Sequence, residues 1–229
     1  MLHKHLPKFS NEGHAHFVTS KTHLNTPLFK NPLCARIVLE ELAFYRREKG
    51  FKVLGYVAMP DHFHGVIWWD VANRPELSIS KIMQGFKGSV ARRIIDELFE
   101  CNAQRASMKH PLHDHHQDSL EYQLKASLQR LMLSATHVSA GGVEHSLRDL
   151  GNADHRRGLK YKIWQTGFYD FNIYSPEKLN QKLKYIHNNP VKAGLCVESE
   201  EYPFSSAWYY AEMKQPNGLN EILCPVDGL

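Results

Sequence analysis

Apolar and polar residues recur along this chain with two different periods, and these periods predict a short series of strands and helices. Runs rich in β-branched and aromatic side chains predict strands at residues 14–24, 51–59, 62–69 and 161–168. Apolar residues spaced by three and four predict helices at 33–49, at 78–99 and between Ser175 and Pro190. The order strand, helix, strand, strand, helix, strand favours an α+β fold, a ferredoxin-like antiparallel sheet with helices packed against it.

The helix after Ser175 has well-defined ends and two distinct faces. Ser175 is a good N-cap, Pro176 suits the first helical position, and Pro190 would stop the helix. Its predicted apolar stripe consists of Leu179, Leu183 and Ile186.

Beside that stripe, a rotation of about 100° per residue brings four polar side chains together. They are Lys178, Lys182, Tyr185 and Asn189. Such a face suits nucleophilic chemistry on a phosphate: the phenol could attack phosphorus, the amide oxygen could bind a hard cation, and the lysines could offset charge. The same residues would also suit an interfacial tyrosine among solvated lysines.

A second candidate site lies in the strand at 62–69. His62 and His64 are two residues apart, so they share one face of the strand and could bind one metal ion. Pro60 and Asp61 supply a turn before them. A core histidine bonded to a carbonyl is the alternative for either residue. His14 and His16 repeat the spacing without that turn and are interpreted as sheet residues.

Composition adds little to these predictions. With 229 residues, 42% of them hydrophobic, the chain can form one good core, and its net charge of +4 favours a polyanionic partner only slightly. A basic patch that could contact DNA is predicted on the helix at 78–99, where a solvated face is equally compatible; its members are Lys81, Lys87, Arg92 and Arg93. Four scattered cysteines and no long apolar stretch predict a cytoplasmic protein with no membrane contact.

Four blocks, in order, resemble the single-tyrosine HUH transposases, and most closely the REP-associated tyrosine transposases of the IS200-like group. They read Met-Pro-Asp-His-Phe-His at 59–64, Ile-Trp-Gln-Thr-Gly-Phe-Tyr-Asp at 163–170, Tyr-Ile-His-Asn-Asn-Pro-Val-Lys-Ala-Gly-Leu at 185–195 and Tyr-Pro-Phe-Ser-Ser at 202–206. The resemblance implies the HUH nuclease fold in a single domain over 1–229. The stretch at about 101–157, rich in histidine and partly helical in pattern, departs from the family and is predicted to be an insertion.

The resemblance also implies an activity and its residues. His62 and His64 match the metal-binding pair, Tyr185 matches the nucleophile, and Asn189 resembles the third ligand. The metal would be Mg²⁺ or Mn²⁺. The substrate would be single-stranded or hairpin DNA, cleaved through a 5′-phosphotyrosine and rejoined by a 3′-hydroxyl. Two simultaneous cleavages would require a homodimer, whereas sequential cleavage would require one subunit.

Three other functions differ from this one in the residues that they require. A histidine-triad hydrolase would need a third histidine where the chain has Val66. A replication or mobilisation initiator would share the HUH chemistry, although the later blocks favour the transposases. A non-catalytic protein that binds hairpin DNA would not need both histidines, Tyr185 and Asn189 together.

Overall fold

A four-stranded antiparallel sheet forms the centre of the protein, which the computed structural model describes at residues 13–107, 162–211 and 224–227. The sheet has the order β2-β3-β1-β4. Its strands are β1 (Ala15–Lys21), β2 (Lys52–Met59), β3 (His62–Trp68) and β4 (Tyr169–Ile173). The helices are α1 (Pro32–Lys49), α2 (Ile79–Ser107), α5 (Pro176–His187), α6 (Asn189–Lys192) and α7 (Ala207–Tyr210). Short 3₁₀ helices span His23–Asn25, Leu28–Lys30 and Ser199–Glu201.

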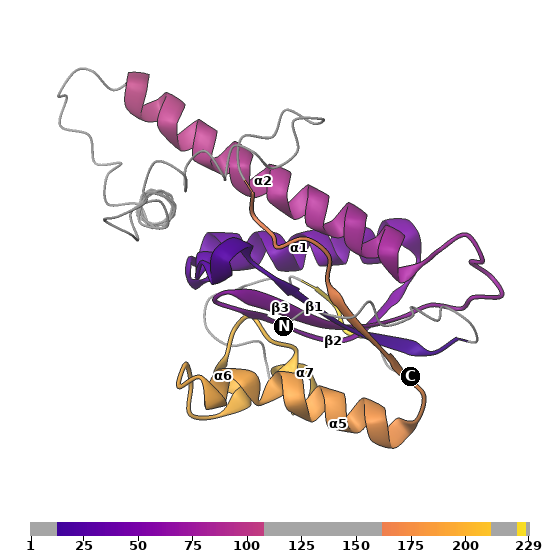
Figure 1. Cartoon of the computed structure of the whole chain (residues 1–229). Helices are drawn as coiled ribbons and strands as arrows, with labels where there is room; N and C mark the ends of the chain where they lie inside the picture. The colour runs from indigo at the N-terminus through magenta and orange to yellow at the C-terminus, as the bar shows by residue number, and fades with distance from the viewer. Residues whose placement is uncertain (1–12, 108–161, 212–223, 228–229) are drawn as a thin grey trace.

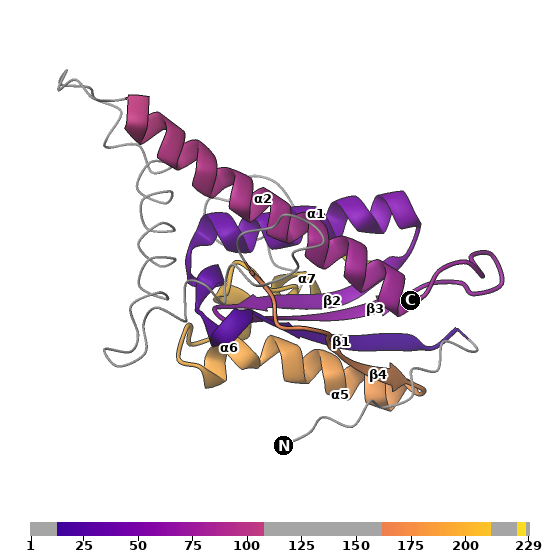
Figure 2. The same cartoon turned by 45° about the horizontal axis from the view of Figure 1, so that its top comes forward.

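The helices lie on both faces of the sheet. Helices α1 and α2 cover one face, while α5, α6 and α7 lie on the other (Figures 1 and 2). The predicted α+β fold, a ferredoxin-like antiparallel sheet with helices packed on it, is confirmed. Because α5 packs on one face alone, only the strand residues that point to that face can reach its side chains.

Capping residues explain where the first helix begins and ends. The side chain of Asn31 accepts a hydrogen bond from the backbone N–H of Leu33, and Pro32 occupies the first turn. Gly50 adopts a φ of 69°, and its N–H donates to the carbonyl of Arg46. The end predicted at Gly50 is therefore confirmed. Helix α2 extends to Ser107, beyond its predicted end at residue 99.

The strand predicted at 161–168 is wrong, because β4 begins at Tyr169. Trp164 forms only an isolated bridge with Thr22, and its ring packs against Phe29 with centroids 5.2 Å apart. Gly167 then turns the chain with a φ of 75°. The apolar character of this block therefore reflects the burial of Trp164 in the core and not a strand.

One sequence prediction lies largely outside the described residues. The histidine-rich insertion at about 101–157 is described only up to Ser107, where its backbone continues α2. The rest, including its histidines, falls in the undescribed range 108–161.

Helix α5 docks on the sheet over Gly55 of β2. A Cβ atom at Gly55 would lie 2.5 Å from Cδ2 of Leu183 and 3.2 Å from Cδ1 of Ile186. Both leucine and isoleucine are buried and belong to the predicted apolar stripe of α5, which is confirmed. The missing side chain of Gly55 is thus what allows the helix to approach the strand.

Replacing Gly55 with alanine is expected to lower the free energy of unfolding by about 1–3 kcal/mol, because the new methyl group overpacks this contact. Urea denaturation followed by circular dichroism measures the change. Gly88→Ala is the matched control, since a Cβ at Gly88 meets nothing within 4 Å. In a helix that change should stabilise by about 0.5–1 kcal/mol. Equal stability of Gly55→Ala and the unaltered protein would contradict the close packing.

Candidate nucleic-acid cleavage site

The two histidines of β3 lie side by side on the face that α5 covers. Their ring centroids are 4.7 Å apart, with the ring planes at 75°. His64 is buried, with 4% of its surface exposed, whereas His62 is partly exposed at the end of the strand. The spacing of two residues on a strand has therefore placed both imidazoles at one site.

Both histidines use Nδ1 for a hydrogen bond within the protein. His64 Nδ1 lies 2.7 Å from Oγ1 of Thr19, and His62 Nδ1 lies 2.6 Å from Oδ1 of Asp61. These contacts leave Nε2 of each ring as the atom that could bind a cation. Burial first, and then the positive charges nearby, lower the pKa of His64 to about 3, so its ring is neutral at neutral pH.

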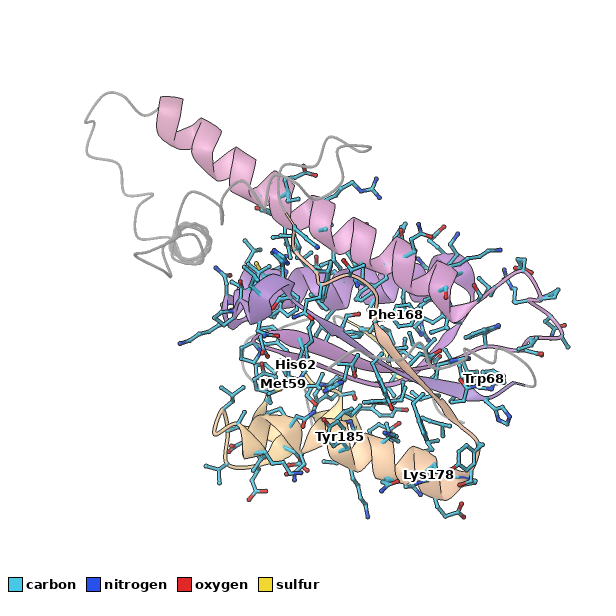
Figure 3. All side chains as sticks on the ribbon, in the orientation of Figure 1. Met59, His62, Trp68, Phe168, Lys178 and Tyr185 are labelled. Carbon is cyan, nitrogen blue, oxygen red and sulfur yellow. The ribbon has the colours of Figure 1, made fainter. Side chains whose placement is uncertain are left out.

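Tyr185 of α5 lies next to this pair. Its ring centroid is 5.5 Å from that of His64 and 6.0 Å from that of Phe17. The side chain is 44% exposed, so solvent and ligands can reach it. Figure 3 shows Tyr185 on the helix that faces the strand carrying His62.

An ammonium group lies between two aromatic rings close to Tyr185. Nζ of Lys182 is 4.4 Å from the ring centroid of Phe17 and 4.5 Å from that of Phe171. Burial, and then the neighbouring Lys178, lower the pKa of Lys182. Lys178 itself donates to Oε1 of Gln181 at 3.0 Å. Phe17 and Phe171 were not predicted as site residues, because their strands had to be paired before they could be placed.

Asn189 lies beyond the end of α5, in contrast to the single helix predicted up to Pro190. Helix α5 ends at His187, Asn188 is its C-cap, and Asn189 begins α6. Proline has no N–H to continue the hydrogen bonds of α5, so the chain restarts as a separate turn. Nδ2 of Asn189 is buried without a hydrogen-bond partner. The oxygen and nitrogen of such an amide are interchangeable by a flip, and an oxygen there could bind a cation.

The end of α5 is fixed to the sheet by a residue of the fourth sequence block. Nε2 of His187 lies 2.8 Å from Oγ of Ser206, and that oxygen accepts from the backbone N–H of Tyr56 at 2.9 Å. Burial lowers the pKa of His187 to about 4, so this ring is also neutral. The contact anchors the helix two residues after Tyr185.

The basic residues predicted on the second helix lie on the opposite side of the sheet from Tyr185, because α2 covers the other face (Figure 1). Lys87 donates to the carbonyl oxygens of Gln165 and Gly167, and Arg93 pairs with Glu40 and Glu41 of α1. Lys81 and Arg92 are exposed on the same helix. The structure therefore does not bring these four residues to the site of Tyr185.

Of the second His-x-His pair, His16 lies in the sheet as predicted, whereas His14 precedes β1, which begins at Ala15. His16 is buried, its Nδ1 lies 3.0 Å from Oδ1 of Asp170, and its ring stacks on Trp69 at 4.9 Å. His16 pairs with Ile67 in the sheet register, so it points away from the face of His62 and His64.

Within the described residues, no group of three His, Cys, Asp or Glu side chains is placed to hold a metal ion. A metal at this site would thus combine the two imidazoles with a different donor, such as an amide. In that same part of the chain, no helix has the length and apolar character needed to cross a membrane.

The first part of the chain resembles a known protein family. Residues 10–111 match the family described as Transposase IS200 like. That range includes the histidine pair and precedes Tyr185. The predicted resemblance to this group of transposases is confirmed.

Solved structures extend the comparison to the whole chain. The chain is similar to a REP-associated tyrosine transposase bound to a REP hairpin, with 14% identity, a TM-score of 0.53, and coverage of 99% of this chain and 93% of that one. At 14% identity, this similarity shows that the two chains share a fold. A putative transposase from Deinococcus radiodurans is 13% identical, with coverage of 80% of this chain and 97% of that one. Its TM-score of 0.35 is too low to show a shared fold. No curated protein matches the chain.

Proposed function

We propose that this protein is a metal-dependent single-stranded DNA endonuclease and strand transferase that acts on hairpin-forming repeats through a 5′-phosphotyrosine. The observation that carries the proposal is the contact of Tyr185 with His64, whose ring centroids are 5.5 Å apart across the interface of α5 and β3. A nucleophile and a metal-binding imidazole in such proximity can act on one phosphate.

In this proposal, His62 and His64 hold a divalent ion, Mg²⁺ or Mn²⁺, through Nε2, and Asn189 supplies an amide oxygen. The donor set fits, because both Nδ1 atoms are already engaged and the Asn189 amide has a buried atom without a partner. When bound, the ion would polarise the scissile phosphate.

The covalent step is an exchange of phosphate esters. The oxygen of Tyr185 bonds to phosphorus, the bond from phosphorus to the 3′ oxygen breaks, and the phenolic proton is lost while the leaving oxygen gains one. Attack by a 3′-hydroxyl on the phosphotyrosine then joins the DNA and restores the phenol. Both steps conserve the number of ester bonds, so neither requires ATP.

Lys182 is proposed to offset the charge of the phosphate as it is attacked. Its ammonium and the ring of Tyr185 both contact Phe17, and Phe171 holds the ammonium from the other side. A cation fixed by two aromatic rings is preorganised and need not be ordered when DNA binds.

The proposed activity is tested with labelled single-stranded hairpin oligonucleotides, incubated with Mn²⁺, with Mg²⁺ or with EDTA. Cleavage that requires the metal, leaves a free 3′-hydroxyl and is reversed by an added 3′-hydroxyl strand would support the proposal. Hairpin binding without cleavage, over several sequences and both metals, would instead identify a non-catalytic DNA-binding protein. Cleavage without rejoining would favour an initiator-type nuclease.

Thr19 is expected to orient His64 for the metal. For Nε2 to bind a cation, Nδ1 must carry the proton and donate it to Oγ1 of Thr19. Thr19→Val removes that acceptor while keeping the side-chain shape, and it should weaken Mn²⁺ binding by about 10–100-fold. Calorimetric titration with Mn²⁺ measures the loss, and Thr19→Ser should restore most of the affinity. Unchanged Mn²⁺ affinity in Thr19→Val would show that the contact does not orient the ring.

A further inference from the structure

An exposed aromatic ring just before α5 and two lysines of that helix lie along one outward-facing surface. Tyr174, just before the helix, is 63% exposed, which is more than the 44% of Tyr185. A hollow of about 630 Å³ lies along this face, and its lining includes Tyr174, Lys178, Gln181 and Lys184. We refer to these four residues as the α5 outer face. It carries two lysines, and among the described residues Glu177 is the one acidic residue that lines the hollow.

The α5 outer face is continuous with the site of Tyr185. Lys178, Gln181 and Tyr185 follow helical spacings of three and four, so they form one row on α5. From Lys178 to Tyr185 the row extends about 10 Å at 1.5 Å per residue. Figure 3 shows Lys178 and Tyr185 along this same helix.

A series of ring and ammonium contacts also links the two tyrosines. The rings of Tyr174 and Phe171 have centroids 6.3 Å apart, and the Phe171 ring contacts the ammonium of Lys182. That ammonium lies over Phe17, whose ring contacts Tyr185. An exposed ring at one end and the proposed nucleophile at the other therefore belong to one packed cluster.

We propose that the α5 outer face binds the single-stranded DNA flank that continues from the scissile phosphate, with a base stacked on Tyr174 and phosphates near Lys178 and Lys184. This inference rests on the proposed function. An exposed ring favours single-stranded DNA, because its bases are free to stack on protein, whereas those of a duplex stack on each other. The lysines match the backbone charge, neither is buried, and within the described part of the chain neither pairs with a carboxylate as Arg93 does.

Tyr174→Ala is expected to weaken binding of a hairpin with single-stranded flanks by about tenfold, the typical effect of one lost stacking contact. Tyr174→Phe should bind within about twofold of the unaltered protein, because it keeps the ring. Fluorescence anisotropy measures both affinities. Tyr209→Ala is the matched control: that tyrosine is 40% exposed but lies on α7 and does not line the hollow, so its loss should not change binding.

Removing the flanks one at a time makes the test specific. On a hairpin without the flank that binds this face, Tyr174→Ala and the unaltered protein should have equal affinity. A loss of similar size on the bare hairpin, or no loss on any substrate, would overturn the inference. Binding to the flanked hairpin weakens with salt, and the slope of log affinity against log salt concentration measures this effect. Lys184→Gln should make that slope shallower by about one unit. An unchanged slope would likewise count against it.

Covalent linkage in the unaltered protein separates this inference from the proposed function. If the unaltered protein forms an adduct and Tyr174→Ala binds every substrate normally, the α5 outer face is excluded as a DNA-binding surface, while the proposed function stands. If the unaltered protein forms no adduct while Tyr174→Ala loses flank-dependent binding, the face binds single-stranded DNA and the proposed chemistry fails.

Discussion

Tyr185→Phe is expected to abolish covalent attachment to DNA, with a loss on the order of 10³-fold or more, while hairpin affinity changes by no more than a few-fold. Phenylalanine retains the ring that contacts His64 and Phe17, so the packing of α5 on the sheet is kept. Only the nucleophilic oxygen is removed. A denaturing gel that resolves protein bound to labelled DNA measures the adduct, and anisotropy measures the affinity.

The matched controls are Tyr169→Phe and Tyr174→Phe. Tyr169 is also exposed, at 42%, and its ring lies 6.1 Å from that of Phe17, so it is the second phenol close to the histidines. Both controls should still form the adduct. If Tyr185→Phe became linked to DNA and Tyr169→Phe did not, Tyr169 would be the nucleophile and the role assigned to Tyr185 would be wrong.

His64→Ala is expected to eliminate DNA cleavage and to lower Mn²⁺ affinity by more than about 100-fold, because one of two imidazole donors is lost. His64 is buried and its ring stacks on Phe17, so a loss of stability is expected as well. His62→Ala, at a more exposed position, should lose Mn²⁺ binding with less effect on stability. Calorimetry with Mn²⁺ and thermal unfolding separate the two effects.

His16→Gln is the control for the histidine pair, since His16 lies on the same sheet and points to its other face. It should destabilise the protein through loss of the buried contact with Asp170 and leave Mn²⁺ affinity unchanged. Mn²⁺ binding that survives His62→Ala would show that the metal uses other donors.

Local patterns were sufficient to predict most of the fold. The spacing of Leu179, Leu183 and Ile186 predicted the buried side of α5, and Gly50 and Ser175 lie at helix ends as caps. The error at 161–168 has a physical cause. Trp164 is buried by packing against Phe29 and Phe86, which are distant in sequence, and an isolated apolar residue cannot be distinguished from a strand residue by pattern alone.

Contacts between strands account for what the sequence could not predict at the site. Thr19 reaches His64 because β1 and β3 pair with these two residues directly opposite each other. That register depends on the whole sheet, and a shift by one residue would turn Thr19 to the other face. Phe17 and Phe171 are opposite each other in the same way and frame Lys182. Helical spacing, by contrast, placed Lys182 beside Tyr185 without any knowledge of the sheet.

Asn189 belongs to a different helix from Tyr185, whereas the sequence pattern predicted one helix. Tyr185 and Asn189 are four residues apart, which would align them on a continuous helix. The break after His187 instead starts a new turn at Asn189. Asn189→Ala with Mn²⁺ titration would therefore assess the third ligand separately from the histidine pair.

Mapping the covalent adduct is the most direct test of the central claim. The protein is incubated with Mn²⁺ and single-stranded hairpin oligonucleotides, the denaturation-resistant species is isolated, and its nucleotide-bearing peptide is sequenced by mass spectrometry. The account predicts a 5′-phosphate attached to Tyr185. A modified residue other than Tyr185, or hairpin binding that never yields an adduct, would contradict it.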